Sequence, residues 1–247
     1  MIIVAGDSYC SFIGPRTWPH QLAKELQMTI KQYSNSGGSW WATRRSLIKA
    51  KNSGELNDAK VVVFCHTEAS RIPNVNDVPL GAWTVEHQRK WREPKIQDAA
   101  KMYYEYIHDP SFAEWAQQAW LNECVDLFPN DAIIIHMHSF AYSYVKLKIS
   151  KGINVFPPLF ALTQAEFSTD EEAFDYISKI GDYGDPRLNH LNTANNIALG
   201  NDLAGIIKNG IKEQFSLNLD KYEIKNIETI KQHSNGTGNL MYKGKAI

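Results

Sequence analysis

The stretch Val61-Val62-Val63-Phe64-Cys65 is a run of apolar residues with no polar alternation. A strand with one face in water alternates polar and apolar residues, so this run indicates a strand that helices cover on both faces. Strands of this kind belong to the parallel sheets of α/β proteins. We therefore expect residues 61–65 to form a central strand of a parallel sheet.

Units of strand, loop and helix lie on both sides of this strand. Other short apolar runs, which predict strands, lie at residues 1–5, 132–135 and 153–155, and residues 28–33 suggest a further strand. Apolar residues at helical spacing begin near 18 and 40, cover 96–108 and 112–128, and resume at about 193. This alternation predicts a doubly wound, mainly parallel sheet of about five strands with helices on both faces.

Composition limits the possible partners. The chain has 247 residues, of which 43% are hydrophobic and 21% are charged, as in ordinary globular proteins. Its formal net charge is -1, so no overall field attracts nucleic acid or an anionic membrane, and neither partner is expected. The composition gives no indication of an oligomeric state.

The expected location is the cytoplasm. No apolar run approaches the roughly 18 residues of a membrane span, and the short apolar start ends at once in Gly6-Asp7. Cys10, Cys65 and Cys124 are too few and too widely spaced for a disulfide framework. We expect one domain over residues 1–215, followed by a polar, loosely packed extension over 216–247 that is richer in Lys and Asn.

Chemically active residues follow the predicted strands. Ligands bind beyond the carboxyl ends of the strands in such sheets, so these positions are the candidates for a site. They are Asp7-Ser8, Gly37-Gly38-Ser39, His66 to Glu68 with Arg71, His136 with His138, and Asp185 with His190. A hydroxyl, a base, a carboxylate and backbone N–H donors are the components of acyl transfer.

Three of these segments resemble the SGNH (GDSL) hydrolases, esterases and deacetylases with a three-layer, flavodoxin-like fold. Val4-Ala5-Gly6-Asp7-Ser8-Tyr9 is similar to their first block, Asn35-Ser36-Gly37-Gly38-Ser39 to their second, and Asp185-Pro186-Arg187-Leu188-Asn189-His190 to their last. The resemblance implies that Ser8 is the nucleophile, His190 the base and Asp185 the acid that orients it. It also implies that the amides of Ser8 and Gly38 bind the oxyanion. The implied reaction cleaves an ester of a small molecule or carbohydrate, for example an O-acetyl group, without a cofactor.

The chain departs from this family at two positions. Glu68 stands where the family has an Asn that donates to the oxyanion, and an ionised carboxylate cannot donate. Thr67, Ser70 or Arg71 are the alternative donors, and Arg71 is also the expected ion-pair partner of Glu68. This variant is loosely similar to phage-encoded members. The second departure is that Asp185 lies five residues before His190 instead of three, so Asp182 or a backbone carbonyl is the alternative orienting group.

Other side chains are candidates for substrate binding. His136 and His138 lie two apart and so share one face of a strand. With His66, Glu68 and His190 they have the chemistry of a metal site, but they lack the spacing of a known ligand set, and no metal is expected. Trp83 and Trp91 lie in a predicted loop over 72–94, where they either offer flat faces to the substrate or anchor the loop.

Two other functions remain open at this stage. Glu68 and the shifted acid are compatible with a non-catalytic binding module on the same fold. The histidines are compatible with a metal-dependent hydrolase. A covalent serine probe distinguishes the esterase from the first alternative, and a chelator distinguishes it from the second.

Overall fold

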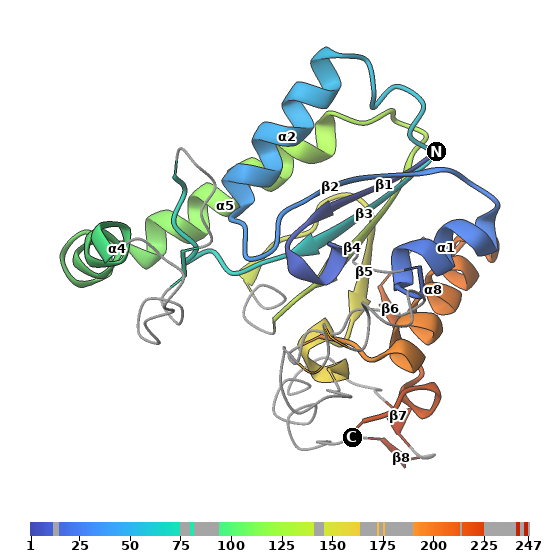
Figure 1. The fold of residues 1–247 in the computed structure, drawn as a ribbon. Helices are drawn as coiled ribbons and strands as arrows, with labels where there is room; N and C mark the ends of the chain where they lie inside the picture. Colours follow the sequence, from blue (N-terminus) through green and yellow to red (C-terminus); the bar gives the residue numbers. More distant parts are fainter. Residues whose placement is uncertain are drawn as a thin grey trace.

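The computed structural model describes residues 1–11, 15–74, 80–81, 94–140, 146–163, 172, 175, 190–212 and 214–224, and the backbone of 241–242 and 245–246. A parallel sheet with the strand order β2-β1-β3-β4-β5-β6 forms its centre (Figure 1). The strands are β1 (Ile2–Gly6), β2 (Ile30–Ser34), β3 (Val61–His66), β4 (Ile133–His138), β5 (Ile153–Phe156) and β6 (Phe215–Ser216). The first five have the flavodoxin-like order 2-1-3-4-5. The predicted fold class is therefore confirmed, with a short sixth strand added.

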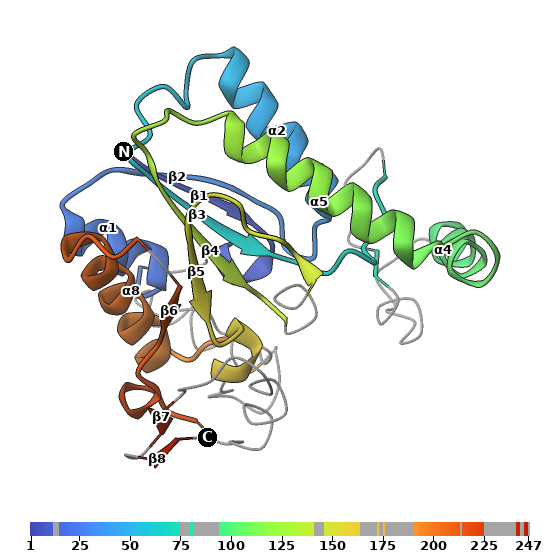
Figure 2. The same cartoon turned by 180° about the vertical axis from the view of Figure 1, so that it is seen from behind.

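Helices cover both faces of the sheet, which makes three layers. One layer contains α1 (Trp18–Leu26) and α8 (Thr193–Lys208), which lie side by side, and the other contains α2 (Trp40–Asn52) and α5 (Pro110–Asp126) (Figures 1 and 2). The helix α4 (Pro94–Tyr106) lies beyond the sheet, at the far end of α5. Short elements complete the fold: η1 (Ser8–Cys10), η2 (Leu159–Leu162), η3 (Leu219–Lys221) and the antiparallel pair β7 (Met241–Tyr242) and β8 (Lys245–Ala246).

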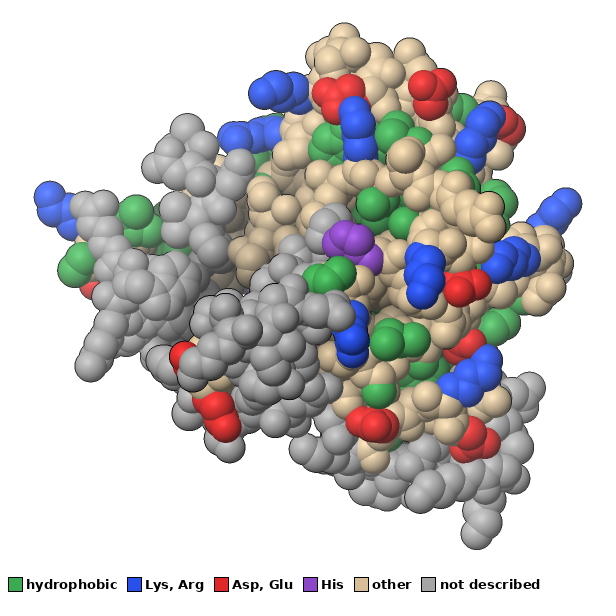
Figure 3. Space-filling model, turned by 45° about the vertical axis from the view of Figure 1, so that its right-hand side comes forward, with side chains coloured by type: hydrophobic (Ala, Val, Ile, Leu, Met, Phe, Trp, Pro, Cys, Tyr) green, Lys and Arg blue, Asp and Glu red, His purple; other side chains and the backbone are tan. Residues whose placement is uncertain are grey.

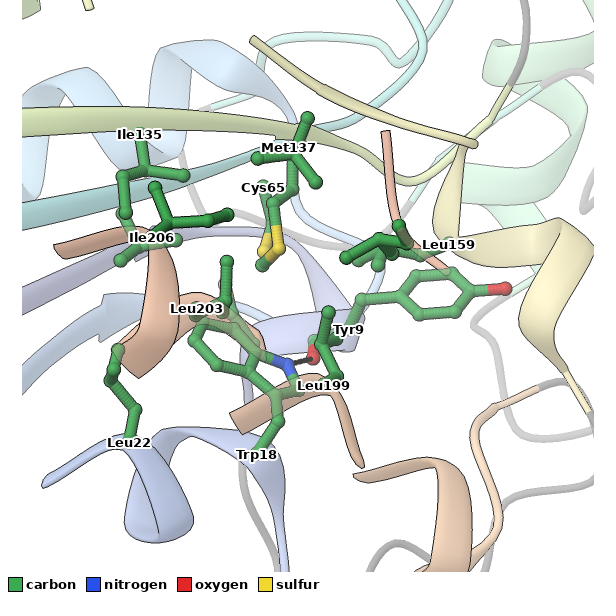
Figure 4. Packing of buried hydrophobic residues seen from close by; sticks show 14 of the residues in the cluster. Tyr9, Trp18, Leu22, Cys65, Ile135, Met137, Leu159, Leu199, Leu203 and Ile206 are labelled. Atoms are coloured by element: carbon green, nitrogen blue, oxygen red, sulfur yellow. Dashed lines mark hydrogen bonds between the residues drawn. The ribbon is translucent and has the colours of Figure 1, made fainter. Parts of the chain in front are cut away.

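The apolar run of β3 is buried on both faces, as its sequence predicts. Alternate residues Val61, Val63 and Cys65 face the layer of α1 and α8, where Trp18 and Leu203 meet them (Figure 4). The intervening Val62 and Phe64 face the layer of α2 and α5. The sheet therefore separates two apolar cores. Because side chains alternate between the two faces along a strand, successive residues of β3 enter different cores.

Helix starts also follow the sequence signals. The side chain of Asn192 accepts a hydrogen bond from the backbone N–H of Asn195 at 2.8 Å, which caps α8. Asp109 caps α5 in the same way, directly before Pro110. These caps fix where α8 begins and hence where His190, just before it, enters the fold.

Described residues on both sides of position 215 pack against the domain. Because β6 pairs with β5 across this position, and because Leu217, Leu219 and Tyr222 are buried in the core with α8, the chain stays packed to at least Tyr222. Apolar residues spaced among the polar ones of the tail supply this packing. Within the described ranges, no helix is both long and apolar enough to cross a bilayer. Basic and acidic side chains are interspersed on the face seen in Figure 3.

Candidate active site at the carboxyl ends of the strands

Ser8 lies on a turn that only glycine permits at the end of β1. Gly6 has a φ of +143°, and a Cβ atom there would lie 2.2 Å from the carbonyl oxygen of Cys65. The chain then turns into η1, whose first residue is Ser8. The side chain of Asp7 caps η1 by accepting a hydrogen bond from the backbone N–H of Tyr9 at 3.1 Å. The sequence block thus holds Ser8 at the carboxyl edge of the sheet, where the residue is 9% exposed.

Asp7 is a buried carboxylate that joins this turn to the end of β4. Its Oδ1 atom also accepts a hydrogen bond from the hydroxyl of Ser139 at 2.8 Å. Its Oδ2 atom has no hydrogen-bond partner among the described residues, and Arg71 Nη2 lies 3.9 Å away. Burying a carboxylate without compensation is costly, so the guanidinium of Arg71 stabilises it electrostatically. The sequence analysis did not identify this role for Asp7 or Ser139, because nothing in their spacing links them.

His190 lies against the Ser8 turn. Its ring stacks on the ring of Tyr9, with the centroids 4.6 Å apart and the planes at 29°. Both rings are buried. Tyr9 itself is anchored in the core, since its carbonyl oxygen accepts a hydrogen bond from the Trp18 indole at 2.8 Å (Figure 4). The fold therefore brings the predicted base from the C-terminal part of the chain to the residue next to the predicted nucleophile.

The predicted orienting acid, Asp185, lies outside the described residues, as does its alternative, Asp182. Trp83 and Trp91 also lie outside them, together with most of the predicted loop that contains them. Their assignments stay predictions. Tyr9 is the residue near His190 that the sequence analysis missed as a functional group, although it stands in the quoted first block.

The Gly38 amide takes part in a turn. Its N–H donates to the carbonyl oxygen of Asn35 at 2.9 Å, and Ser39 then caps α2. A Cβ atom on Gly38 would lie 2.8 Å from that of Asn35, so a side chain there would disturb the turn. Donation from this amide to an oxyanion therefore requires the bond to Asn35 to be shared or released.

Glu68 and Arg71 form the expected ion pair, but at long range. Arg71 Nε lies 4.0 Å from Glu68 Oε2, and the Arg71 side chain is 12% exposed while that of Glu68 is 40% exposed. Arg71 thus lies between two carboxylates, those of Glu68 and Asp7. Its guanidinium also lies over the ring of Phe140, 5.9 Å from the centroid, and Phe140 contacts the ring of Tyr9 edge-on. Arg71 is therefore linked through Phe140 and Tyr9 to His190.

The histidines of β3 and β4 occupy a different place from the one predicted. We expected His136 and His138 after the fourth strand, but β4 extends through both, and their side chains are buried. They face the layer of α2 and α5 together with His66, which stacks on Trp40 at 5.1 Å. Tyr9 and the Ser8 turn face the opposite layer. The sheet therefore separates these histidines from the core that contains Tyr9, and their side chains are buried.

Hydrogen bonds define the protonation of this histidine cluster. The carbonyl oxygen of Lys151 can only accept, so His136 Nε2 donates to it at 2.9 Å. His136 Nδ1 must then accept, and the donor is His66 Nε2 at 2.9 Å. Burial lowers the pKa of His136 to about 4, and burial followed by the neighbouring histidines lowers the pKa of His66 well below its ordinary value. Both rings are thus neutral at pH 7.

His136 and His138 do not have the free ring nitrogens that the metal-dependent alternative would need from both of them. His136 uses both ring nitrogens in the hydrogen bonds just described, and His138 Nε2 bonds to Asn154 Oδ1 at 2.8 Å. Within the described part of the chain, no group of three or more His, Cys, Asp or Glu residues is arranged to hold a metal ion. The histidines connect β3, β4 and β5 through their side chains.

Comparison with known proteins shows a distant structural similarity. No family model matches the sequence, and no curated protein matches it. Among solved structures, the chain is similar to a carbohydrate esterase family 2 enzyme with its carbohydrate-binding domain from Corynascus thermopiles (Myceliophthora fergusii). The sequence identity is 14% and the TM-score 0.40, over 85% of this chain and 66% of the other. This chain thus spans slightly less than two thirds of that protein, and the function has to be argued from the site.

Proposed function

We propose that this protein is a serine esterase of the SGNH type, in which Ser8 is the nucleophile, His190 the general base and Asp185 the orienting acid. The stacking of His190 on Tyr9 is the observation that carries the proposal. It supports a base beside the hydroxyl that follows β1, which is the relation acyl transfer requires. The proposed substrate is an ester, and an O-acetyl group on a carbohydrate is the candidate to test first.

The proposed reaction has two steps. The Ser8 hydroxyl attacks the ester carbonyl carbon while His190 takes its proton, and His190 then gives that proton to the departing alcohol, which leaves an acyl-serine. Water attacks the acyl-serine with His190 again as the base, which releases the acid and restores the Ser8 hydroxyl. The amides of Ser8 and Gly38 bind the oxyanion, with the Gly38 amide leaving its bond to Asn35 as charge develops.

Arg71 makes this chemistry compatible with Glu68. A carboxylate near a developing oxyanion would raise the barrier, because like charges repel and a donor is missing. The position of Arg71 between Asp7 and Glu68 supports a role in which its charge offsets both carboxylates. Its guanidinium has more N–H groups than these two long contacts use, so it is also the candidate replacement for the donor that the family's Asn supplies.

A fluorophosphonate probe tests the proposal. We expect stoichiometric labelling of Ser8, mapped by mass spectrometry of peptides, and loss of both labelling and ester hydrolysis in Ser8→Ala. Ser11→Ala is the matched control, because this hydroxyl lies just beyond the same turn and bonds to Ser34 Oγ, and it should keep both. Labelling of another residue, or unchanged turnover in Ser8→Ala, would contradict the assignment of the nucleophile.

The second candidate is a non-catalytic binding module, which the engaged Gly38 amide and the carboxylate of Glu68 favour. In that case the wild-type protein would neither take up the probe nor hydrolyse activated esters, while acetylated oligosaccharides would still bind in calorimetry. Hydrolysis that depends on Ser8 excludes this candidate.

A further inference from the structure

Large apolar side chains are exposed together at one corner of the molecule. In the described ranges six large hydrophobic residues are strongly exposed, and five of them lie between residues 102 and 115. These five are between 60% and 72% exposed: Met102, Tyr106, Ile107, Phe112 and Trp115. The sixth, Phe160, is 41% exposed and lies on η2. We call the five residues the α4–α5 corner.

These residues lie on or next to two consecutive helices, α4 and α5. Met102 and Tyr106 are four apart and share a face of α4, and Ile107 follows directly. Phe112 and Trp115 are three apart on the first turns of α5, with ring centroids 5.9 Å apart. The helices meet at this corner, which stands away from the sheet in Figures 1 and 2.

The core clusters of the described residues do not include this corner. The inner side of α4 contacts Ile72 and Leu80 through Ala100 and Tyr104. The C-terminal half of α5 enters the core beside α2 through Leu121 and its neighbours. The helices are therefore held by their other faces, and the corner residues remain in water at a cost in free energy.

The exposed apolar area approaches what each partner of a protein dimer buries. Aromatic side chains have about 150–250 Å² each, so the three aromatic residues at these exposures present roughly 400 Å² and the five residues together roughly 600 Å². Stable interfaces bury about 800 Å² on each partner, with a polar rim around an apolar centre enriched in aromatic residues and Met. The α4–α5 corner would supply most of such a centre.

The charges beside the corner favour a second copy of this chain as the occupant. Lys101 and Glu105 are both exposed and lie one turn apart on α4. A twofold axis through the corner would set Lys101 of one copy beside Glu105 of the other, so the rim complements itself. A strongly acidic or basic partner would lack this complement.

We propose that the protein forms a homodimer through twofold packing of the α4–α5 corner. The interface is isologous, with the five apolar residues of each copy meeting those of the other at its centre. This inference is independent of the proposed esterase activity, because it rests on a surface that does not include the Ser8 turn.

Sedimentation equilibrium or light scattering of the full chain tests the proposal at about 1 to 100 µM, where a micromolar dimer assembles. We expect twice the chain mass of 28.1 kDa. Trp115→Glu should weaken association at least about 100-fold, because it removes a central aromatic residue and would bury a charge. Tyr106→Glu should act in the same direction from the other helix, and both variants should keep the wild-type circular dichroism spectrum.

Phe160→Glu is the matched control, since it places the same charge on the exposed aromatic residue outside the corner, and it should remain dimeric. A wild-type protein that is monomeric at about 100 µM would overturn the proposal. The same holds for a dimer that survives both Trp115→Glu and Tyr106→Glu. Ester hydrolysis per chain should be the same in Trp115→Glu and Tyr106→Glu as in the wild type, so a failure of the dimer is distinguishable from a failure of the esterase.

Discussion

Acidification should destabilise the protein between pH 6.5 and pH 4 through the buried histidine cluster. Burial lowers the pKa of His136 from its ordinary value of 6.5 to about 4 in the folded state. The unfolded chain therefore binds a proton in this range that the folded chain excludes. Stability from this effect is fully present above pH 6.5 and is lost as the pH falls toward about 4.

The size of the effect follows from the two pKa values. A difference of about 2.5 units corresponds to about 3 kcal/mol of unfolding free energy lost by pH 4. Between pH 6 and 5 the slope from His136 alone should be about 1 kcal/mol per pH unit. His66, whose pKa is also lowered by burial, should add to it.

Urea unfolding followed by tryptophan fluorescence at pH 7, 6, 5.5 and 5 measures this slope. His136→Gln is the informative variant, because an amide can donate to Lys151 O and accept from His66 without titrating. It should reduce the slope by about 1 kcal/mol per pH unit. His20→Gln is the control, since His20 is only partly buried on α1, and its effect on the slope should be much smaller. Equal slopes for the wild type and His136→Gln would refute the reasoning.

Three further predictions concern the site and its turn. Tyr9→Leu should lower kcat about 10-fold and change KM less, because His190 loses the ring on which it stacks. Tyr9→Phe keeps a stacking ring and should retain activity. Equal losses of activity in Tyr9→Leu and Tyr9→Phe would contradict the stacking role. Glu68→Gln should keep or raise turnover of a small activated ester, and Arg71→Ala should lower it at least about 10-fold; the opposite pattern would show that Glu68 acts in catalysis. Gly6→Ala should lower the free energy of unfolding in urea by about 3 kcal/mol or more, because the new Cβ atom would meet a backbone carbonyl. Gly205→Ala in α8 is the control, because the position has open space, and it should raise the free energy of unfolding by about 0.5–1 kcal/mol.

Local patterns predicted the scaffold well because they act over short distances. The unbroken apolar run of β3 indicated burial on both faces, and the structure confirms it. The helical spacing of apolar residues indicated helices close to where α8 and α5 begin. Strand ends were less accurate. β4 continues through His138 because the buried histidines pair with each other and with backbone, which makes polar residues compatible with a central strand.

The relation between distant residues was harder to predict. The spacing of two residues predicted that His136 and His138 share one face of the sheet, but it did not predict which face. In the structure they lie on the face opposite to the core that contains Tyr9. The contact between Tyr9 and His190 and the bond between Asp7 and Ser139 join segments far apart in the chain. Neither pair has a sequence spacing that signals contact.

The sequence by itself determined the class of fold and the central place of β3 in the sheet. It also determined the three segments from which the proposed site is built. These features depend on hydrophobic periodicity, helix caps and a glycine-containing turn, which are properties of neighbouring residues. Only the tertiary structure decided that Arg71 lies between Asp7 and Glu68, that the Gly38 amide is engaged and that the α4–α5 corner is exposed. The physical reason is that charge compensation, hydrogen-bond partners and exposure depend on which elements pack together in space, and strand register and helix layers set that packing.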